Sequence, residues 1–491
     1  MKRPSHSLRL MAVLMLAGVL FSACATNPVT KQSQFVLMSE DQELKLGQEA
    51  AAQVAKQLPL MPADDPLVQY VDKVGQRVAA VADRPDLIYR FHVIDEPTIN
   101  AFALPGGYIY IYRGLLVNLN SEAELAAVLG HEIGHVTARH AVQQYTQAQS
   151  YRLGMAVASI FVPIPQAGGQ LSNLLVTAII RGYSRQDELQ ADELSIKYIA
   201  KAGYDVHATT DLLKTLKRLE DLKAKEEKDT TGKPPETYHG AFATHPRTEK
   251  RIKQAVAEAA GKQSELAEDG HNAMLAALDG YPYGDSPDQG AVVGHRFLHP
   301  KLGIQIKFPK GWVIENSPRA LNAQIRQKKV FFQMQLKELQ KHRTAAEMIR
   351  KFFPDRHIGP ITQSQRDGFK VGQAVVTMSA PHISQARILA TVFLEHDKAF
   401  VTMGWCDRHT FDAHQSQFES IADSFRHYDA KRDGGIPRVH LIVWKQGDSW
   451  QLLARHSHNI LGRFTANKIA VMNGMGLNET PKAGTVIKTV R

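Results

Sequence analysis

Apolar and polar residues follow different periods in different parts of the chain, and these periods predict a mixture of helices and strands. Residues 122–140 are rich in Ala, Leu and Glu and contain no proline, which favours a helix, and Ser121 and Glu124 have the spacing of a capping box. A second helix is predicted over residues 185–202, because Ser184 is suited to cap its start and a glycine follows its end.

A strand is predicted at Tyr108–Tyr112, where residue types alternate after the turn formed by Gly106 and Gly107. If this strand lies at the edge of a sheet, an extended polypeptide can pair with its backbone. The alternative is an ordinary hairpin in the core of the domain.

The second half of the chain predicts an α+β domain over residues 291–428. We assign it a binding or spacing role, because no catalytic constellation lies in it. Its predicted elements have the periods expected of partly buried strands and helices. They are strand-like runs at 302–309, 373–378 and 388–393 and helical runs at 345–353 and 418–425.

The predicted fold class is therefore α+β: a mainly helical first domain with a small sheet, an α+β accessory domain and a small β-α-α-β module. With 491 residues and 44% hydrophobic content, the chain has enough material for two or three cores. Composition shifts and Pro/Gly-rich stretches place the boundaries at a signal segment 1–24, a first domain 25–260, a linker 261–290, an accessory domain 291–428, a linker 429–436 and a module 437–491.

The N-terminal sequence predicts export. Three basic residues precede an apolar stretch over 10–21, which is too short to span a bilayer and fits a secretory signal. The segment resembles a bacterial lipoprotein signal, in which Cys24 is acylated, and Ala25 after it implies sorting to the outer membrane. Only Cys406 would then remain, so no intramolecular disulfide is expected.

A second apolar stretch, residues 153–180, carries no charge but is interrupted by two prolines and a Gly-Gly pair. A membrane-spanning helix needs about twenty mostly apolar residues, which this stretch does not offer in one run. We therefore expect two shorter pieces, buried or forming a lid, whose movement would gate access to a nearby site.

The formal net charge of +10 does not indicate a nucleic-acid-binding protein, because the basic residues are scattered and no nucleic-acid motif is present. A protein beneath an anionic envelope has a simpler reason to be basic. No nucleic-acid partner is expected.

Candidate chemistry concentrates in residues 131–135, with the sequence His-Glu-Ile-Gly-His. Two imidazoles one helical turn apart share a face, close enough to ligate one metal ion, and a carboxylate stands beside them. A third ligand is needed. The metzincin pattern would require Gly at 138 and His at 141, but Ala138 and Ala141 stand there. His140 falls on a different face and is predicted to be a surface histidine.

The predicted third ligand is Glu188, which shares one face of the second helix with Asp192. Asp192 would accept a hydrogen bond from the far nitrogen of a metal-bound histidine and fix its tautomer. Without a partner motif, two such acids would be read as a solvated helix face. Next to the histidine pair, two His, one Glu and an open position make up a catalytic zinc set.

Four ordered motifs between about residues 40 and 260 make the chain similar to the gluzincin peptidases of the CAAX-prenyl-protease and HtpX-like family, including its periplasmic members. They are Asn100–Tyr110 followed by Arg113–Leu116, the HExxH motif, the Ser-Arg-x-x-Glu-x-x-Ala-Asp segment at 184–192, and Thr244-His245-Pro246 with Arg251 six residues after the histidine.

The resemblance implies a metalloendopeptidase with one Zn²⁺ ion per chain, ligated by His131, His135 and Glu188. In such a site zinc lowers the pKa of its water and polarises the peptide carbonyl, while Glu132 takes the water's proton and passes it to the leaving amine. The resemblance associates His245 and an arginine six residues later with the substrate oxyanion. In some periplasmic members the histidine instead fills the fourth zinc position and holds the enzyme shut.

Two further expectations concern the groups around the metal. Because proline suits the first position of a helix, His245 is expected near a helix N-terminus, where its protonated form is disfavoured. The resemblance implies that Arg251 contacts the oxyanion with it, and a structural role for either residue is the alternative. Substrate contacts are expected from Asn100, Ala101, Gly106, Gly107 and Tyr108.

Residues 437–491 resemble a divergent LysM module, a β-α-α-β unit that commonly binds peptidoglycan or chitin. The resemblance depends on short segments that include Gly447-Asp448-Ser449, Asn473-Gly474 and Pro481-Lys482. It implies contact with peptidoglycan, and the alternative is a purely structural cap.

The sequence thus predicts a zinc-dependent endopeptidase of the bacterial envelope, and the family resemblance implies that it cleaves misfolded or misassembled envelope proteins. Its expected place is the periplasm, lipid-anchored at the inner leaflet of the outer membrane. Two other functions stay open. The C-terminal module prompts a zinc-dependent cell-wall hydrolase, and the same groove suits a non-proteolytic chaperone or assembly factor.

Overall fold

The computed structural model describes two compact units, each treated by itself below. The described residues are 24–26, 29, 33–35, 38–147, 182–231, 245, 249–259, 269–317, 320–325, 328–339, 344–380, 383–461 and 465–491. The predicted signal segment and the stretch 153–180 therefore lie outside them, apart from Cys24, whose backbone belongs to strand β1 (Cys24–Thr26). No helix among the described residues combines the length and the apolar character needed to cross a membrane.

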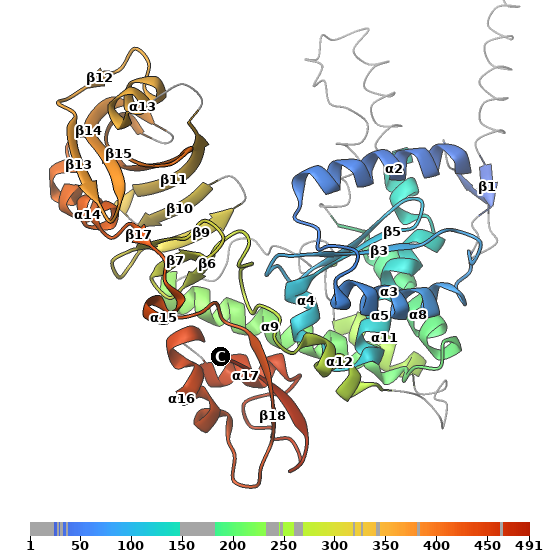
Figure 1. The fold of residues 1–491 in the computed structure, drawn as a ribbon. Coiled ribbons are helices and arrows are strands. Elements are labelled where there is room, and N and C mark those ends of the chain that lie inside the picture. Colours follow the sequence, from blue (N-terminus) through green and yellow to red (C-terminus); the bar gives the residue numbers. More distant parts are fainter. Residues whose placement is uncertain are drawn as a thin grey trace, which may run out of the picture. The chain divides into compact units, whose positions relative to one another are not determined.

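Unit 1 comprises the chain up to Tyr281 together with residues 439–458 and 463–490. Its helices surround a small sheet with the strand order β3-β5-β4, in which β3 is parallel and β4 antiparallel to β5 (Figure 1). The elements before residue 282 are β2 (Ser33–Phe35), α2 (Glu40–Gln57), α3 (Pro66–Ala79), β3 (Arg90–Ile94), β4 (Ala101–Leu104), β5 (Tyr108–Tyr112), α4 (Arg113–Asn118), α5 (Glu122–Thr137), α8 (Arg185–Lys201), α9 (His207–Thr231), α11 (Glu249–Ala259) and α12 (His271–Leu278).

The strand predicted at Tyr108–Tyr112 forms as β5, but it is the central strand of its sheet. Of the two alternatives for this segment, the core hairpin is the one observed. Both β3 and β4 are edge strands, but the outer side of β3 is partly paired with residues 59–61. Asn100 O accepts a hydrogen bond from Tyr112 N at 3.0 Å, so the antiparallel alternation turns the backbone N–H and C=O groups of Ala101 and Ala103 away from β5. The free edge of the sheet thus belongs to β4.

Both predicted helices form, and their caps differ in detail. At the start of α5, Ser121 Oγ accepts from Glu124 N at 3.1 Å, but the Glu124 carboxylate accepts from Asn120 N at 2.7 Å. The predicted capping box is therefore only half formed. At the start of α8 the box is complete, between Ser184 and Asp187.

The C-terminal residues have the predicted β-α-α-β order, with the two strands paired antiparallel. Most of these residues group with unit 1, where α17 contacts α9 and β19 contacts α12. Within the predicted linker, α12 forms and buries Met274, Leu275 and Leu278 completely. The elements are β18 (Val439–Val443), α16 (Trp450–Leu461), α17 (Thr465–Met472) and β19 (Val486–Val490).

Lys488 of β19 anchors these residues to the segment before α5. Its side chain is fully buried, and its Nζ donates to the carbonyl oxygens of Val117, at 2.9 Å, and Leu119. Burial lowers the pKa of Lys488 to about 7, although the nearby Glu124 carboxylate opposes the shift. A buried amine at two backbone carbonyls is a contact that no local sequence pattern predicts.

Lys488→Ala is expected to lower the free energy of unfolding of unit 1 by about 1–3 kcal/mol, because it leaves two buried carbonyls without a donor. Lys482→Ala, at an exposed lysine of the same segment, is the control and is expected to change it by less than about 0.5 kcal/mol. Hydrogen exchange of the α4 and α5 amides in the full chain measures both. Equal protection in the two variants would contradict the anchoring role.

Unit 2 is an α+β domain built mainly of antiparallel strands. Its larger sheet has the order β12-β14-β15-β16-β11-β10-β9, with β13 also paired to β14, and its smaller sheet has the order β17-β8-β7-β6. Successive residues of β16 point to opposite faces of the larger sheet. Phe400 belongs to the core that includes residues of α14, and Val401 belongs to the core that includes residues of α13. The elements are β6 (Ala291–Val293), β7 (Arg296–His299), β8 (Ile304–Lys307), β9 (Val313–Ser317), β10 (Ala320–Ile325), β11 (Val330–Glu338), α13 (Ala345–Phe352), β12 (His357–Ile358), β13 (Thr362–Arg366), β14 (Phe369–Ala380), β15 (Ile383–Glu395), β16 (Lys398–Asp407), α14 (Phe411–Asp423), β17 (Arg426–His427) and α15 (Ala430–Asp433).

Candidate metal centre

Helices α5 and α8 approach each other closely because two glycines of α5 face α8. A Cβ atom on Gly134 would lie 3.2 Å from the backbone oxygen of Ala191, and one on Gly130 would lie 3.1 Å from Ser195 Oγ. Both distances are tighter than ordinary contacts of a real side chain. The glycines therefore allow the acidic residues of α8 to lie opposite the histidines of α5.

Four side chains converge at this contact: His131, His135, Glu188 and His245, each with a donor atom within 4.8 Å of the others. His131 Nε2 is 3.1 Å from His135 Nε2 and 3.3 Å from His245 Nδ1. Glu188 Oε1 is 2.8 Å from His245 Nδ1 and 3.6 Å from His135 Nε2. Tetrahedral ligands bound at about 2.0–2.1 Å lie about 3.3 Å from one another, so these separations fit a zinc ion at the centre.

Hydrogen bonds behind the cluster orient its lone pairs. His140 Nε2 lies 2.9 Å from Gln190 Oε1 and carries a proton, so His140 Nδ1 accepts from His135 Nδ1 at 2.8 Å. His131 Nδ1 lies 3.0 Å from Asp192 Oδ1 and holds the proton of that ring. Both Nε2 atoms are left with lone pairs that face each other, an arrangement that a cation between them stabilises.

The prediction that His140 is a surface residue is wrong, because its side chain is 1% exposed. Helix α5 ends at Thr137, and Arg139 adopts a left-handed conformation with φ of 61°, so the chain turns back beside His135. The Arg139 guanidinium lies 2.8 Å from Glu43 of α2. Glu43 is distant in sequence from Arg139. The local sequence pattern therefore gives no sign that α5 ends at Thr137, before His140.

Arg251 of α11 holds the two carboxylates of α8. Its Nε and Nη2 donate to Asp192 at 2.6 and 2.7 Å, and its Nη1 lies 2.7 Å from Glu188 Oε2. Burial alone would raise the pKa of both carboxyl groups. Arg251 outweighs burial at Asp192, and His245 together with Arg251 outweighs it at Glu188, so both pKa values are lowered. Since each nitrogen of the guanidinium faces a carboxylate, the geometry favours positioning of Glu188 and Asp192 over contact with an oxyanion.

Glu132 and His245 present unused polar atoms to the same space. Glu132 is 2% exposed, and its Oε1 lies 3.6 Å from His245 Nε2. Among the described residues, no group hydrogen-bonds to Glu132 Oε2 or His245 Nε2. Burial raises the pKa of Glu132, which suits a group that must accept a proton near neutral pH.

In the metal-free protein, two opposing effects act on the pKa of His245. Burial lowers the pKa of this imidazole, but the carboxylates of Glu188 and Glu132 outweigh burial and raise it to about 9. The residues between His245 and α11 lie outside the described part of the chain, so the expected helix N-terminus at Pro246 cannot be compared.

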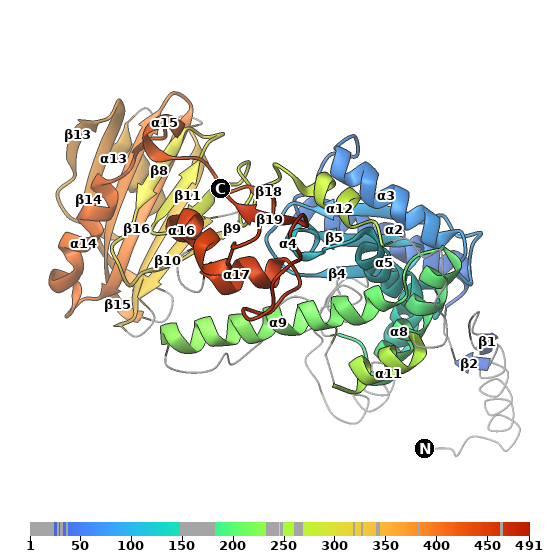
Figure 2. The same cartoon turned by 90° about the horizontal axis from the view of Figure 1, so that it is seen from below.

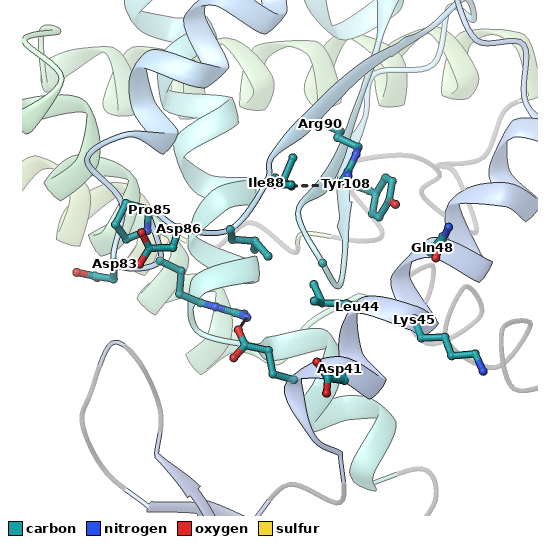
Figure 3. Close-up of a pocket in the computed structure, with 14 residues that line it drawn as sticks. Asp41, Leu44, Lys45, Gln48, Asp83, Pro85, Asp86, Ile88, Arg90 and Tyr108 are labelled. Carbon is teal, nitrogen blue, oxygen red and sulfur yellow. Dashed lines mark hydrogen bonds and ion pairs between the residues drawn. The ribbon is translucent and has the colours of Figure 1, made fainter.

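The structure separates the five expected substrate-binding residues. Ala101, next to Asn100, lines a pocket beside the donor cluster. Gly106 and Tyr108 lie at the other end of the β4–β5 hairpin and line a different pocket of about 710 Å³, which faces α2 (Figure 3). Gly107 lies in the same turn with φ of 84°, a conformation that favours glycine. Only one end of the hairpin therefore reaches the cluster.

Tyr183 also belongs to the site, although the sequence offered no signal for it beyond its place before the Ser184 cap. Its ring stacks on His135 with a centroid distance of 3.9 Å and an interplanar angle of 18°. The side chain is 5% exposed, and burial raises its pKa. It forms an apolar wall that keeps the His135 ring in place.

Comparison with known proteins relates the same region to a peptidase family. Residues 67–259 match the model of peptidase family M48. The chain is 32% identical over 233 residues to the mitochondrial metalloendopeptidase OMA1 of Schizosaccharomyces pombe, a match that covers 46% of this chain and 64% of that protein.

Two bacterial proteins match a similar part of the chain. It is 33% identical over 221 residues to the putative beta-barrel assembly-enhancing protease of Vibrio cholerae, covering 43% of each chain. It is 28% identical over 254 residues to the beta-barrel assembly-enhancing protease of Escherichia coli K12, covering 50% of this chain and 49% of that one. The chain thus spans about half of the length of these two relatives.

Proposed function

We propose that this chain, whose residues 67–259 match the model of peptidase family M48, is a zinc-dependent endopeptidase of the bacterial envelope that cleaves misfolded or misassembled proteins. The observation that carries the proposal is the spacing of His131, His135, Glu188 and His245, with the Glu132 carboxylate beside them, whose Oε2 has no hydrogen-bond partner among the described residues. The names of two relatives refer to beta-barrel assembly, which supports an envelope substrate.

In the proposed mechanism His131, His135 and Glu188 hold the ion, which when bound supplies Lewis-acid activation of a water molecule and of the peptide carbonyl. Glu132 accepts the proton of the attacking water and delivers it to the leaving amine. Asp192 fixes the tautomer of His131. An extended substrate pairs with the outer edge of β4, where the backbone groups of Ala101 and Ala103 point outward.

His245 closes the resting site in this proposal, because its Nδ1 occupies the fourth corner of the donor set. His245→Ala is therefore expected to raise the rate of peptide hydrolysis, by up to about tenfold if the closed form dominates. His207→Ala, at a histidine of α9 outside the cluster, is the control. A fall of about 10²-fold or more on losing His245 would instead assign it to the oxyanion.

The direct test measures the metal content of the purified chain and its action on two substrates offered separately, unfolded casein and purified peptidoglycan. We expect one zinc ion per chain, cleavage of casein, no action on peptidoglycan, and loss of cleavage on chelation with recovery when zinc is restored. Cleavage of peptidoglycan alone would favour the cell-wall hydrolase. Zinc binding without any hydrolysis would favour the chaperone or assembly factor.

Two finer parts of the proposal concern location. Cys24 is proposed to carry a lipid anchor that holds the protein in the periplasm at the inner leaflet of the outer membrane. Residues 437–491 are proposed to contact peptidoglycan as a LysM-like module. Labelling with palmitate, absent in Cys24→Ser, tests the anchor, and co-sedimentation with peptidoglycan tests the module.

A further inference from the structure

Helix α9 lies beside α5, α8 and α11 (Figure 2). A small pocket next to the donor cluster is lined by residues of α5, α8, α9 and α11. Its volume is about 50 Å³, and His131 and Glu132 are among its lining residues. The lining also includes apolar side chains of α4, α5 and α9 that take no part in the proposed chemistry. They are Leu115, Val128, Leu212, Leu213 and Leu216.

We infer that this cavity, here called the α9 pocket, receives a substrate side chain next to the scissile bond and selects small aliphatic or hydroxyl side chains: Ala, Val, Ser and Thr. The inference rests on the proposed peptidase function and gives it a substrate preference. A side chain adjacent to the reacting carbonyl must lie beside Glu132 and His131, and this is where the pocket opens.

The size of the α9 pocket excludes large side chains. One water molecule needs about 10–15 Å³ of such a cavity, so this one has room for only about three to five groups of that size. Its leucines are each at most 7% exposed and are packed against neighbouring helices. A Phe or Trp side chain would therefore have to displace α9, which is costly in a packed core.

The lining also excludes charged side chains. Of the charged residues in the lining, Asp192 and Arg251 already bond to each other at 2.6 and 2.7 Å. Glu132 and His245 also line the pocket but belong to the proposed catalytic site, so a substrate Lys or Asp would lose its hydration without gaining a charged partner that has no other role.

Thr209 of α9 gives the pocket a polar feature. This residue is 3% exposed, and its Oγ1 has no hydrogen-bond partner among the described residues. The other hydroxyl in the lining, Ser195 Oγ, already donates to Ala127 O at 2.7 Å. Because an unpaired buried hydroxyl is costly, Thr209 is suited to bond to a substrate Ser or Thr hydroxyl.

The test profiles the cleavage sites of a peptide library with the zinc-loaded full chain. We expect Ala, Val, Ser and Thr to be enriched at one of the two positions that flank the scissile bond. Leu213→Ala enlarges the pocket and is expected to shift the preference about tenfold toward Leu and Phe. Thr209→Val is expected to lower the preference for Ser and Thr relative to Val. Leu67→Ala, at a leucine of α3 that is equally buried and does not line the pocket, is the control.

A second measurement separates this inference from the proposed function. Zinc-loaded protein carrying Glu132→Gln is titrated with peptides that differ in the flanking residues, so affinity is measured without turnover. If the wild-type chain hydrolyses none of the peptides, the result counts against the proposed function. Affinities of the Glu132→Gln protein that still vary with the flanking residue would support the α9 pocket. Equal affinities, or a cleavage profile that Leu213→Ala leaves unchanged, overturn the inference.

Discussion

Glu132→Gln is expected to lower kcat/KM for peptide hydrolysis by about 10²–10⁴-fold and to leave the zinc content unchanged. Glutamine keeps the size of the side chain but cannot take up the proton of the attacking water. The carboxylate is not one of the four converging donors, so the metal should still bind. Peptide cleavage and metal analysis of the same preparation measure both effects.

The matched control is Glu122→Gln, in the first turn of the same helix. The Glu122 carboxylate is also buried, and it accepts hydrogen bonds from Tyr70 at 2.7 Å and Tyr204 at 2.8 Å, away from the donor cluster. Its loss is expected to spare hydrolysis. If Glu132→Gln hydrolyses peptides as fast as Glu122→Gln does, Glu132 is not the general base.

Arg251→Met is expected to lower the free energy of unfolding of unit 1 in the metal-free protein by about 3–5 kcal/mol. The variant leaves the carboxylates of Glu188 and Asp192 buried without their cationic partner. Removal of one member of a buried ion pair costs far more than removal of one from an exposed pair. Chemical unfolding followed by hydrogen exchange in unit 1 measures the difference.

The control for Arg251→Met is Lys214→Met on α9, where the pair with Asp211 is about half exposed on each side, at 50% and 58%. Its effect is expected to stay below about 1 kcal/mol. A similar loss in both variants would show that the buried pairs do not stabilise the helix contact.

The same interaction predicts a pH dependence. The folded protein lowers the pKa of both Asp192 and Glu188, so it binds fewer protons there than the unfolded chain does. The stabilisation is therefore complete above the unfolded pKa values, near about 4, and is lost as the pH falls through the lowered folded values. The difference between wild type and Arg251→Met should shrink in that acidic range. A difference that is constant between neutral pH and pH 3 would contradict the ion-pair origin.

Secondary structure near the motifs was predictable because it depends on neighbours in the sequence. Ser121 and Ser184 cap the helices that their positions indicate. A spacing of four residues on a helix places His131 beside His135 and Glu188 beside Asp192. The β-α-α-β order at the C-terminus was also readable, since its turns and apolar runs are local.

The grouping of the C-terminal residues with the first domain has a non-local reason. Domain boundaries were inferred from glycine, proline and charge along the chain, but packing of α12 and β19 against the first domain depends on buried partners far away. Lys488 reaches carbonyl oxygens more than three hundred residues earlier. A lysine in a strand gives no sign that its amine is buried.

By itself, the sequence determined which residue types stand one helical turn apart, and with them the two histidines, the adjacent glutamate and the acidic pair that converge in the structure. The tertiary structure alone decided that His140 is buried behind His135, that Arg251 binds the two acids, and that the free edge of the sheet belongs to β4. The physical reason is the range of the interaction. Helical periodicity and capping act over a few residues, whereas these three outcomes depend on partners in other helices and strands, which only the packing of the core brings together.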